Sequence, residues 1–215
     1  MINIQNYEHW LRNPNLPLQL QTKKQSKGDY MRNDKTHFTF VFDLDNTLIE
    51  TNLANNKSYK EAIRQVADTD IEINPKQRFT REKLSSSLKD LSKEKLSEII
   101  NLKEKLYIRY MNVSVLNKDL YTLLRILYTG GNETILLTNS REKRARQLCS
   151  YYSLSNYFSS QYFFEDCPQN KYQILSQKGY DLKRIVLFEN DPIAIQAAVE
   201  NGIKQKNVIK VQFNK

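Results

Sequence analysis

Two aspartates, separated by one residue, directly follow a short apolar run. The run HFTFVF occupies residues 37–42, and the sequence DLDNT continues over residues 43–47. An aspartate such as Asp43 can attack phosphorus and form an aspartyl-phosphate, which divides a difficult hydrolysis into two easier displacements. A second carboxylate two residues on, Asp45, can protonate the leaving oxygen and then activate water. This pair therefore suits phosphoryl transfer.

Further polar side chains with matching chemistry follow later in the chain. They are Thr138 with Asn139, then Lys171, and then Glu189, Asn190 and Asp191. A hydroxyl and a lysine can hold phosphate oxygens, and Mg²⁺ between the nucleophile and the last acidic group offsets the repulsion between two anions. Where apolar runs form parallel strands, ligands bind beyond their carboxyl ends, so these side chains are expected at one edge of a sheet.

Histidine and cysteine are scarce. A zinc enzyme, a Ser-His-Asp hydrolase or a papain-like protease would need His9 or His37 in the catalytic role, and neither lies in a suggestive context. Cys149 and Cys167 are too few for a disulfide framework, so we expect free thiols in a reducing compartment. Because no apolar run could span a membrane and the first twenty residues do not resemble a signal peptide, we predict a cytoplasmic protein.

The net charge of +9 raises the possibility of a nucleic-acid partner. The excess is spread over the chain, however, with +3 in residues 1–37, +2 in residues 38–130 and +4 in residues 131–215. Nucleic acid is therefore not favoured as the main partner. One local cluster occupies residues 141–146, with the sequence REKRAR. A solvated helix face is favoured there over arginines placed near an anionic substrate.

Short apolar runs alternate with helix-like segments in the first and last parts of the chain. This order predicts an α/β fold, with a parallel sheet covered by helices on both faces. A clear helix follows Asp191, which offers an N-cap before Pro192, and Asn201-Gly202 ends it. The expected strands are 37–42, 134–138, 161–164, 184–189 and 207–213.

An insertion of helical sequence separates the first two strands. Residues 51–130 contain almost no strand signal, and Ser58 with Glu61 fits a capping box that opens a helix ending near Ala67. Residues 1–36 are polar and read as an extension, with at most a short helix at 7–11. The α/β core then comprises 37–50 and 131–215. Leucine and isoleucine repeats predict three more helices in the insertion, around 84–91, 96–106 and 120–127.

The motifs together resemble the haloacid dehalogenase-like superfamily of Mg²⁺-dependent phosphatases and phosphotransferases. VFDLDNTLIE looks like the first motif of that family and LLTNS like the second; Lys171 fits the third, and LFENDPIAIQAA resembles the fourth. The resemblance covers residues 38–215 and implies a Rossmann-like α/β core. The position and size of the insertion at 51–130 look like the α-helical cap that some members carry.

The resemblance also implies a role for each matching residue. Asp43 would be the nucleophile and a Mg²⁺ ligand, and Asp45 the general acid/base that also binds the metal through its backbone carbonyl. Thr138 would hydrogen-bond the transferred phosphate with Asn139 beside it, and Lys171 would orient the nucleophile. Members that cleave carbon–halogen bonds lack an acid at the position of Asp45, so dehalogenation is disfavoured.

The fourth motif departs from the pattern of the family. Its adjacent acidic pair falls on Glu189 and Asn190, so an amide stands where a carboxylate ligand is expected. Magnesium prefers hard oxygen and could use Glu189, Asn190 or Asp191. The favoured function is a Mg²⁺-dependent phosphomonoester hydrolase; a phosphomutase and a non-catalytic binding protein on this fold are the alternatives. The phosphorylated substrate could be a small metabolite, a nucleotide or a phosphoprotein.

Overall fold

The computed structural model describes residues 38–75, 77–166 and 169–213. The predictions for the extension at 1–36, for His9 and His37, and for Cys167 lie outside these residues. Within them, five parallel strands form one sheet in the order β5-β4-β1-β6-β7. The strands are β1 (Thr39–Phe42), β4 (Glu133–Leu137), β5 (Ser160–Tyr162), β6 (Ile185–Glu189) and β7 (Val208–Lys210). The predicted parallel α/β fold is confirmed.

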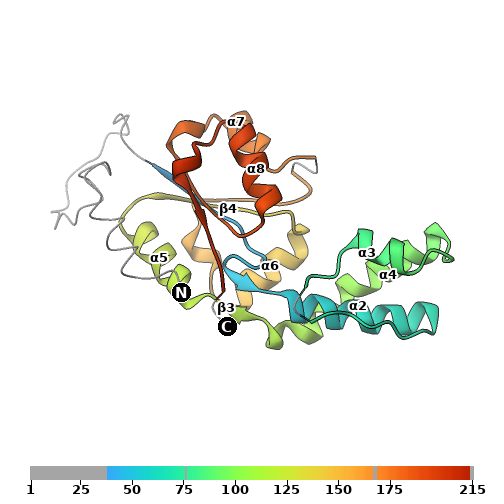
Figure 1. Cartoon of the computed structure of the whole chain (residues 1–215). Helices are drawn as coiled ribbons and strands as arrows, with labels where there is room; N and C mark the ends of the chain where they lie inside the picture. Colours follow the sequence, from blue (N-terminus) through green and yellow to red (C-terminus); the bar gives the residue numbers. More distant parts are fainter. Residues whose placement is uncertain (1–37, 76, 167–168, 214–215) are drawn as a thin grey trace.

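Helices connect the strands and cover the sheet. The α-helices are α2 (Asn52–Ala67), α3 (Arg81–Ser87), α4 (Lys93–Leu106), α5 (Lys118–Thr129), α6 (Glu142–Tyr151), α7 (Gln173–Gln177) and α8 (Pro192–Glu200). Short 3₁₀ helices occupy Tyr107–Val113, Ser155–Tyr157, Leu182–Arg184 and Gln205–Asn207. Helices α5 and α6 lie on one face of the sheet and α7 and α8 on the other, as Figure 1 shows. Among the described residues, every helix is too short or too polar to cross a bilayer.

Strand β1 lies in the middle of the sheet and is buried on both faces. Phe40 and Phe42 pack with the leucines of α5 in one core cluster, whereas Val41 packs with residues of α7 and α8 in another. The alternation follows from the two-residue period of a strand. Phe42 pairs in register with Leu136 of β4 and Phe188 of β6, so the carboxyl ends of the three strands are level.

The insertion divides its packing between two cores. Helices α2, α3 and α4 project from the sheet, as Figure 1 shows, and enclose a core of their own around Tyr59, Ile63 and Ile99. Helix α5, in contrast, packs its leucines onto the sheet. A two-stranded antiparallel ribbon, β2 (Ile49–Glu50) with β3 (Val115–Leu116), joins the chain where it leaves for the projecting helices and where it returns.

The start of α2 differs from the prediction. The helix begins at Asn52, so the capping box proposed at Ser58 is wrong. Ser58 is buried inside the helix, where its hydroxyl donates to the Ala54 carbonyl one turn back at 2.7 Å. Because this hydroxyl is bonded within the helix, Ser58 can lie in the helix interior and does not mark its first turn. Helix α3 ends at Ser87, before the last two leucines of its predicted repeat.

Replacing Phe42 with alanine is expected to destabilise the protein strongly. Its ring stacks on Phe188 at 4.6 Å between centroids, and the side chain is fully buried in the central strand. The cavity should cost about 3–5 kcal/mol of unfolding free energy and lower Tm by roughly 10 °C in a thermal melt. Ile193→Ala is the control, because Ile193 is 80% exposed and should change stability by under about 0.5 kcal/mol. Equal losses in the two variants would contradict the assignment of β1 as the central strand.

Candidate active site

A tight turn after β1 sets the positions of the two aspartates. The Leu44 carbonyl accepts hydrogen bonds from the backbone N–H groups of Leu48 and Ile49, both at 3.0 Å. Asn46 has a φ of 61°, a left-handed conformation that asparagine tolerates better than most residues. Its side-chain carbonyl also accepts from the Thr51 N–H at 3.1 Å. The chain therefore reverses within a few residues and holds the aspartates at the end of the strand.

Asp43 lies buried beside a lysine from a distant part of the chain. Its Oδ1 accepts from Lys171 Nζ at 2.7 Å, and its Oδ2 accepts from the Thr47 hydroxyl at 3.0 Å. Its backbone N–H donates to the Phe188 carbonyl of β6 at 3.0 Å. The structure thus brings Asp43 and Lys171, two of the predicted site residues, into direct contact.

Glu189 completes a buried cluster of charges. Its Oε2 accepts from Lys171 Nζ at 2.7 Å and from the Tyr172 hydroxyl at 2.9 Å. Its Oε1 accepts the backbone N–H groups of Asn190 and Asp191, at 2.9 and 3.1 Å. Both oxygens are thus engaged by protein donors, and Glu189 holds Lys171 in place beside Asp43.

The charge balance of this cluster shifts the pKa values of its members. Burial and the neighbouring carboxylate of Glu189 raise the pKa of Asp43 to about 7, although Lys171 opposes the shift. Burial disfavours the charged form of Lys171, but the two carboxylates around it dominate and raise its pKa well above the usual value. One ammonium between two carboxylates leaves one negative charge in excess, which adds to the effect of burial on the pKa of Asp43.

The two residues after Glu189 have separate roles. The Asn190 side-chain carbonyl lies next to Asp43, since the Thr47 hydroxyl is 3.1 Å from Asn190 Oδ1 and 3.0 Å from Asp43 Oδ2. Asp191 is exposed, and its Oδ1 accepts from the Ile193 N–H at 2.9 Å as the N-cap of α8. The predicted N-cap is confirmed. The structure places the Asn190 side chain beside Asp43 and leaves the Asp191 side chain on the surface.

Asp45 turns toward the insertion and two arginines. Arg144 of α6 donates from its two terminal nitrogens to the two carboxylate oxygens, at 3.2 and 3.0 Å. Arg78, from the loop before α3, reaches Oδ1 at 3.3 Å. The hydroxyls of Thr51 and Ser140 also donate to the carboxylate, Thr51 at 2.6 Å. Burial opposes the charge of Asp45, but the guanidinium groups and hydroxyls hold its pKa well below the usual range.

The second motif supplies one buried and one exposed predicted residue. Thr138 is buried at the end of β4, and its hydroxyl accepts from the Ser140 N–H at 3.1 Å. Asn139 is exposed at the same strand end. Ser140 was missed by the sequence analysis, although it stands two residues after Thr138 and its hydroxyl bonds both Asp45 and Arg144.

The basic cluster at 141–146 separates into two kinds of arginine. Arg146 is exposed and pairs with Glu142 at 2.7 Å, as the prediction of a solvated helix face requires. Arg144 is buried and pairs with Asp45, so that prediction is wrong for this residue. The signal was present in the spacing, because Arg144 precedes the buried Leu148 by four residues and so shares its helix face.

A model of the haloacid dehalogenase-like hydrolase family matches residues 40–208, which is most of the chain. The chain belongs to this family. The match includes Asp43, Thr138, Lys171 and Glu189. The resemblance predicted from the four motifs is confirmed. No curated protein is similar enough in sequence to count as a match.

Solved structures of haloacid dehalogenase-like proteins share the fold at low sequence identity. CbbY from Rhodobacter sphaeroides, solved with phosphate, superimposes with a TM-score of 0.70 at 16% identity, covering 83% of this chain and 87% of that chain. A family hydrolase from Streptococcus pneumoniae gives 0.64 at 16%, covering 78% and 82%. A putative beta-phosphoglucomutase from Thermotoga maritima gives 0.60 at 14%, covering 83% and 87%. At such identities, the likeness shows the common fold.

The donor atoms beside Asp43 suit a hard cation of the kind this family uses. In the parts of the chain that the structure describes, no three His, Cys, Asp or Glu side chains cluster in a way that could hold a metal. Oxygen atoms do converge, however, because Asp43 Oδ2 and Asn190 Oδ1 share the Thr47 hydroxyl. One carboxylate and one amide oxygen fit Mg²⁺, which keeps several of its waters when it binds protein.

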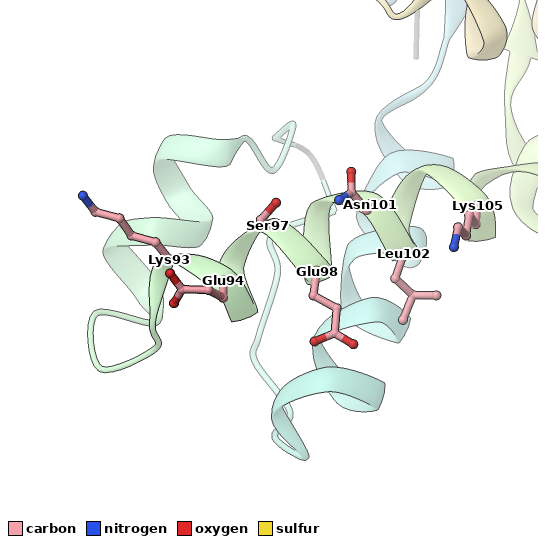
Figure 2. A pocket seen from close by; sticks show the side chains of 7 residues that line it. All are labelled: Lys93, Glu94, Ser97, Glu98, Asn101, Leu102 and Lys105. Atoms are coloured by element: carbon pink, nitrogen blue, oxygen red, sulfur yellow. The ribbon is translucent and has the colours of Figure 1, made fainter.

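A surface hollow of about 690 Å³ lies away from this chemistry. It runs along the exposed side of α4, and Figure 2 shows that its lining side chains all come from that one helix. None of them belongs to the strand-end loops. We therefore place the candidate site of this hydrolase at Asp43 and Asp45 and treat the hollow as part of a solvated helix surface.

The raised pKa of Asp43 predicts how stability depends on pH without metal. A carboxyl whose pKa is raised in the folded state adds stability at low pH and loses it as the pH rises toward about 7. Asp43→Asn stays neutral at every pH, so it avoids the cost of a buried negative charge at residue 43. In EDTA, the Tm of the variant minus the Tm of the unchanged protein should therefore be larger at pH 8 than at pH 5, by roughly 5 °C.

Differential scanning fluorimetry at the two pH values measures this gap. Asp70→Asn is the control with the same chemical change, since Asp70 is 68% exposed and pairs with Lys60 only at 3.8 Å. Its difference in Tm from the unchanged protein should be the same at both pH values. A pH-independent gap for Asp43→Asn would contradict the excess negative charge inferred around Lys171.

Proposed function

We propose that this chain is a Mg²⁺-dependent phosphomonoester hydrolase that acts through an aspartyl-phosphate on Asp43. The observation that carries the proposal is the buried contact of Asp43 with Lys171, backed by Glu189, at the strand ends of a haloacid dehalogenase-like fold. Lys171 fixes one oxygen of Asp43, and the Thr47 hydroxyl fixes the other. A carboxylate held in this way is oriented for attack on phosphorus.

In the first step, an oxygen of Asp43 attacks phosphorus as the bond to the leaving oxygen breaks. The phosphoryl group passes to Asp43, and Asp45 gives its proton to the leaving oxygen, so an alcohol departs. Asp45 is two residues further along the turn and is the nearest second carboxyl in the sequence. To donate, it must first carry a proton and face the leaving oxygen, away from Arg144.

In the second step, water attacks the phosphorus of the aspartyl-phosphate. Asp45 accepts a proton from this water, inorganic phosphate leaves, and the carboxylate of Asp43 is restored. The two steps together convert a phosphomonoester and water into an alcohol and phosphate. Asp45 acts as an acid and then as a base, so it ends each cycle with its proton back.

The groups around Asp43 stabilise charge in both steps. Thr138 and Asn139, at the end of β4, would hydrogen-bond the transferred phosphate, and the ammonium of Lys171 neutralises part of its charge. Asp43, Asn190 and the backbone carbonyl of Asp45 would hold Mg²⁺. When bound, this cation reduces the repulsion between the anionic nucleophile and the anionic substrate.

We further propose that the insertion works as a cap that admits substrate and then excludes water. Arg78 reaches Asp45 from the loop before α3, so the insertion contributes directly to the surroundings of the acid/base. The nature of the leaving group stays open between a small metabolite, a nucleotide and a phosphoprotein. Cytoplasmic localisation remains a prediction from the sequence.

Asp43→Asn should abolish hydrolysis of p-nitrophenyl phosphate in the presence of Mg²⁺. The amide cannot form the phosphoenzyme, so the loss should exceed about a thousandfold in kcat. The measurement is the increase in absorbance as p-nitrophenolate is released. Asp70→Asn should keep the activity, because Asp70 is exposed and lies outside the site. Turnover retained in Asp43→Asn would sink the proposed mechanism.

A phosphomutase is the second candidate, suggested by the structural likeness to the putative beta-phosphoglucomutase. It would isomerise a sugar phosphate in the presence of a bisphosphate activator and release free phosphate slowly.

A non-catalytic binding protein is the third candidate, suggested by the amide at Asn190. It would show no Mg²⁺-dependent turnover of any phosphoester and would bind an anionic partner in a salt-sensitive way. A panel of phosphometabolites, nucleotides and phosphopeptides separates the three.

Asn190→Asp should tighten the use of Mg²⁺. The substitution adds a carboxylate oxygen where Asn190 Oδ1 now lies beside Thr47 and Asp43. Because an ionised oxygen binds a hard cation more strongly than an amide does, the Mg²⁺ concentration for half-maximal activity should fall by about tenfold. A Mg²⁺ titration of the activity measures it. Asp181→Asn, a change in an exposed carboxylate paired with Arg184, is the control. An unchanged titration in Asn190→Asp would show that residue 190 is not a ligand.

A further inference from the structure

The loop that carries Arg78 has no regular structure of its own. Between α2 and α3, the described residues 69–75 and 77–80 form neither helix nor strand. Arg78 nevertheless reaches the segment that follows β1, where it donates to the Thr51 hydroxyl at 2.8 Å and to Asp45 Oδ1 at 3.3 Å. Ordering a loop costs conformational entropy at every residue, so contacts with other elements must hold this loop in place.

Asn56 of α2 binds the loop on both sides of Arg78. Its side-chain carbonyl accepts from the Phe79 N–H at 2.9 Å, and its amide nitrogen donates to the Gln77 carbonyl at 2.8 Å. These two backbone groups flank residue 78. A side-chain amide carries an acceptor and a donor side by side, so it can pair with both groups as a residue of an adjacent antiparallel strand would. Asn56 therefore takes the place of a strand partner for the residue that reaches Asp45.

Neighbouring residues of α2 hold the same stretch of the loop. Asn55 donates to the Phe79 carbonyl at 2.8 Å, and the Phe79 ring packs edge-on against Tyr59, with 5.1 Å between the ring centroids. Asn55, Asn56 and Phe79 are buried, at 1%, 5% and 6% exposure, so water has little access to replace these bonds. The backbone around Arg78 is therefore bound to α2.

The guanidinium of Arg78 extends from this bound backbone to the carboxylate of Asp45. Thr51 and Arg78 both donate to Asp45 Oδ1, Thr51 at 2.6 Å. An arginine side chain has many rotamers in solution, and it loses entropy when it makes such bonds. A backbone that is already held in place reduces that loss. Asn56 itself bonds the loop, so its influence on Asp45 passes through Arg78.

We infer that Asn56 is a positioning residue that holds Arg78 against Asp45. This inference rests on the proposed function, in which Asp45 serves as an acid and then as a base. In both steps, the Asp45 carboxyl must turn toward the reacting atoms, and the bonds from Arg78 and Thr51 to Oδ1 provide a fixed pivot for that turn. Loss of the Asn56 amide releases the loop and, with it, this restraint on Asp45.

Limited digestion with trypsin tests the anchoring without any turnover. Trypsin cuts after an arginine where the chain can leave its contacts, so cleavage after Arg78 reports release of the loop. Asn56→Leu has a side chain of similar size that makes neither bond, and it should speed this cleavage by at least about tenfold. Asn101→Leu is the matched control, because Asn101 is exposed on α4, and it should leave the rate unchanged. Fragment masses identify the cut.

Cleavage after Arg184 is the internal reference, since Arg184 lies directly before β6 in the α/β core. A rate after Arg78 that rises by less than about threefold, or by no more than the rate after Arg184, would overturn the inference. If Asn56→Leu does not fold, Asn56→Asp carries the test with the same threshold. Its carboxylate keeps the acceptor for Phe79 but cannot donate to Gln77.

Kinetics show whether the anchoring matters to Asp45. With p-nitrophenyl phosphate and Mg²⁺, Asn56→Leu and Arg78→Met should each lower kcat by about tenfold and change KM by less than about twofold. The variant with both changes should lose no more than Arg78→Met alone, because Asn56 acts through Arg78. An Asn56 that only stabilised the fold would give losses that multiply. Losses that multiply, or an unchanged kcat in Arg78→Met, would refute the positioning role.

The two measurements separate this inference from the proposed function. If the unchanged protein hydrolyses no phosphoester but Asn56→Leu speeds the cut after Arg78, the hydrolase proposal fails and the anchoring of Arg78 stands. If hydrolysis is found and Asn56→Leu leaves kcat unchanged, the positioning role fails and the hydrolase proposal stands.

Discussion

The ammonium of Lys171, buried between two carboxylates, is the interaction on which the rest of the site depends. Asp43 follows β1 and Glu189 ends the neighbouring strand β6, so their side chains would repel each other without a cation between them. Lys171 lies 2.7 Å from both. A buried charge is tolerated only with partners of this kind. The position of the Asp43 side chain is therefore fixed by charge balance as well as by the turn that follows β1.

The cluster remains one negative charge in excess even with Lys171 in place. Backbone N–H groups, the Tyr172 hydroxyl and Lys171 all donate to Glu189. Burial and the neighbouring carboxylate of Glu189 raise the pKa of Asp43. In the proposed mechanism, a cation beside Asp43 and Asn190 would offset this excess and favour the ionised form of Asp43. The charge of the cluster is therefore consistent with the proposed metal site.

Features carried by short segments were predictable from the sequence, and features made by distant segments were not. The five apolar runs predicted the parallel sheet, and Asp191-Pro192 predicted the start of α8. The charged partners of Asp45 lie far along the chain, 33 residues away at Arg78 and 99 at Arg144, and no local pattern pairs residues so far apart. The packing partner of helix α5 was also not predictable, because its leucine repeat could pack against a sheet or against other helices equally well.

The side chains of the two aspartates of the DLDNT motif have different surroundings. The side-chain partners of Asp43, Lys171 and Thr47, lie outside the projecting helices, whereas Asp45 is bonded by Arg78 from among them. The β2–β3 ribbon, directly beyond the motif, connects those helices to the core. A movement of the helices about this ribbon would therefore change the contact of Arg78 with Asp45, the proposed acid/base, and leave Asp43 with Lys171. The same turn of the chain thus holds one carboxylate against the core and places the other within reach of the insertion.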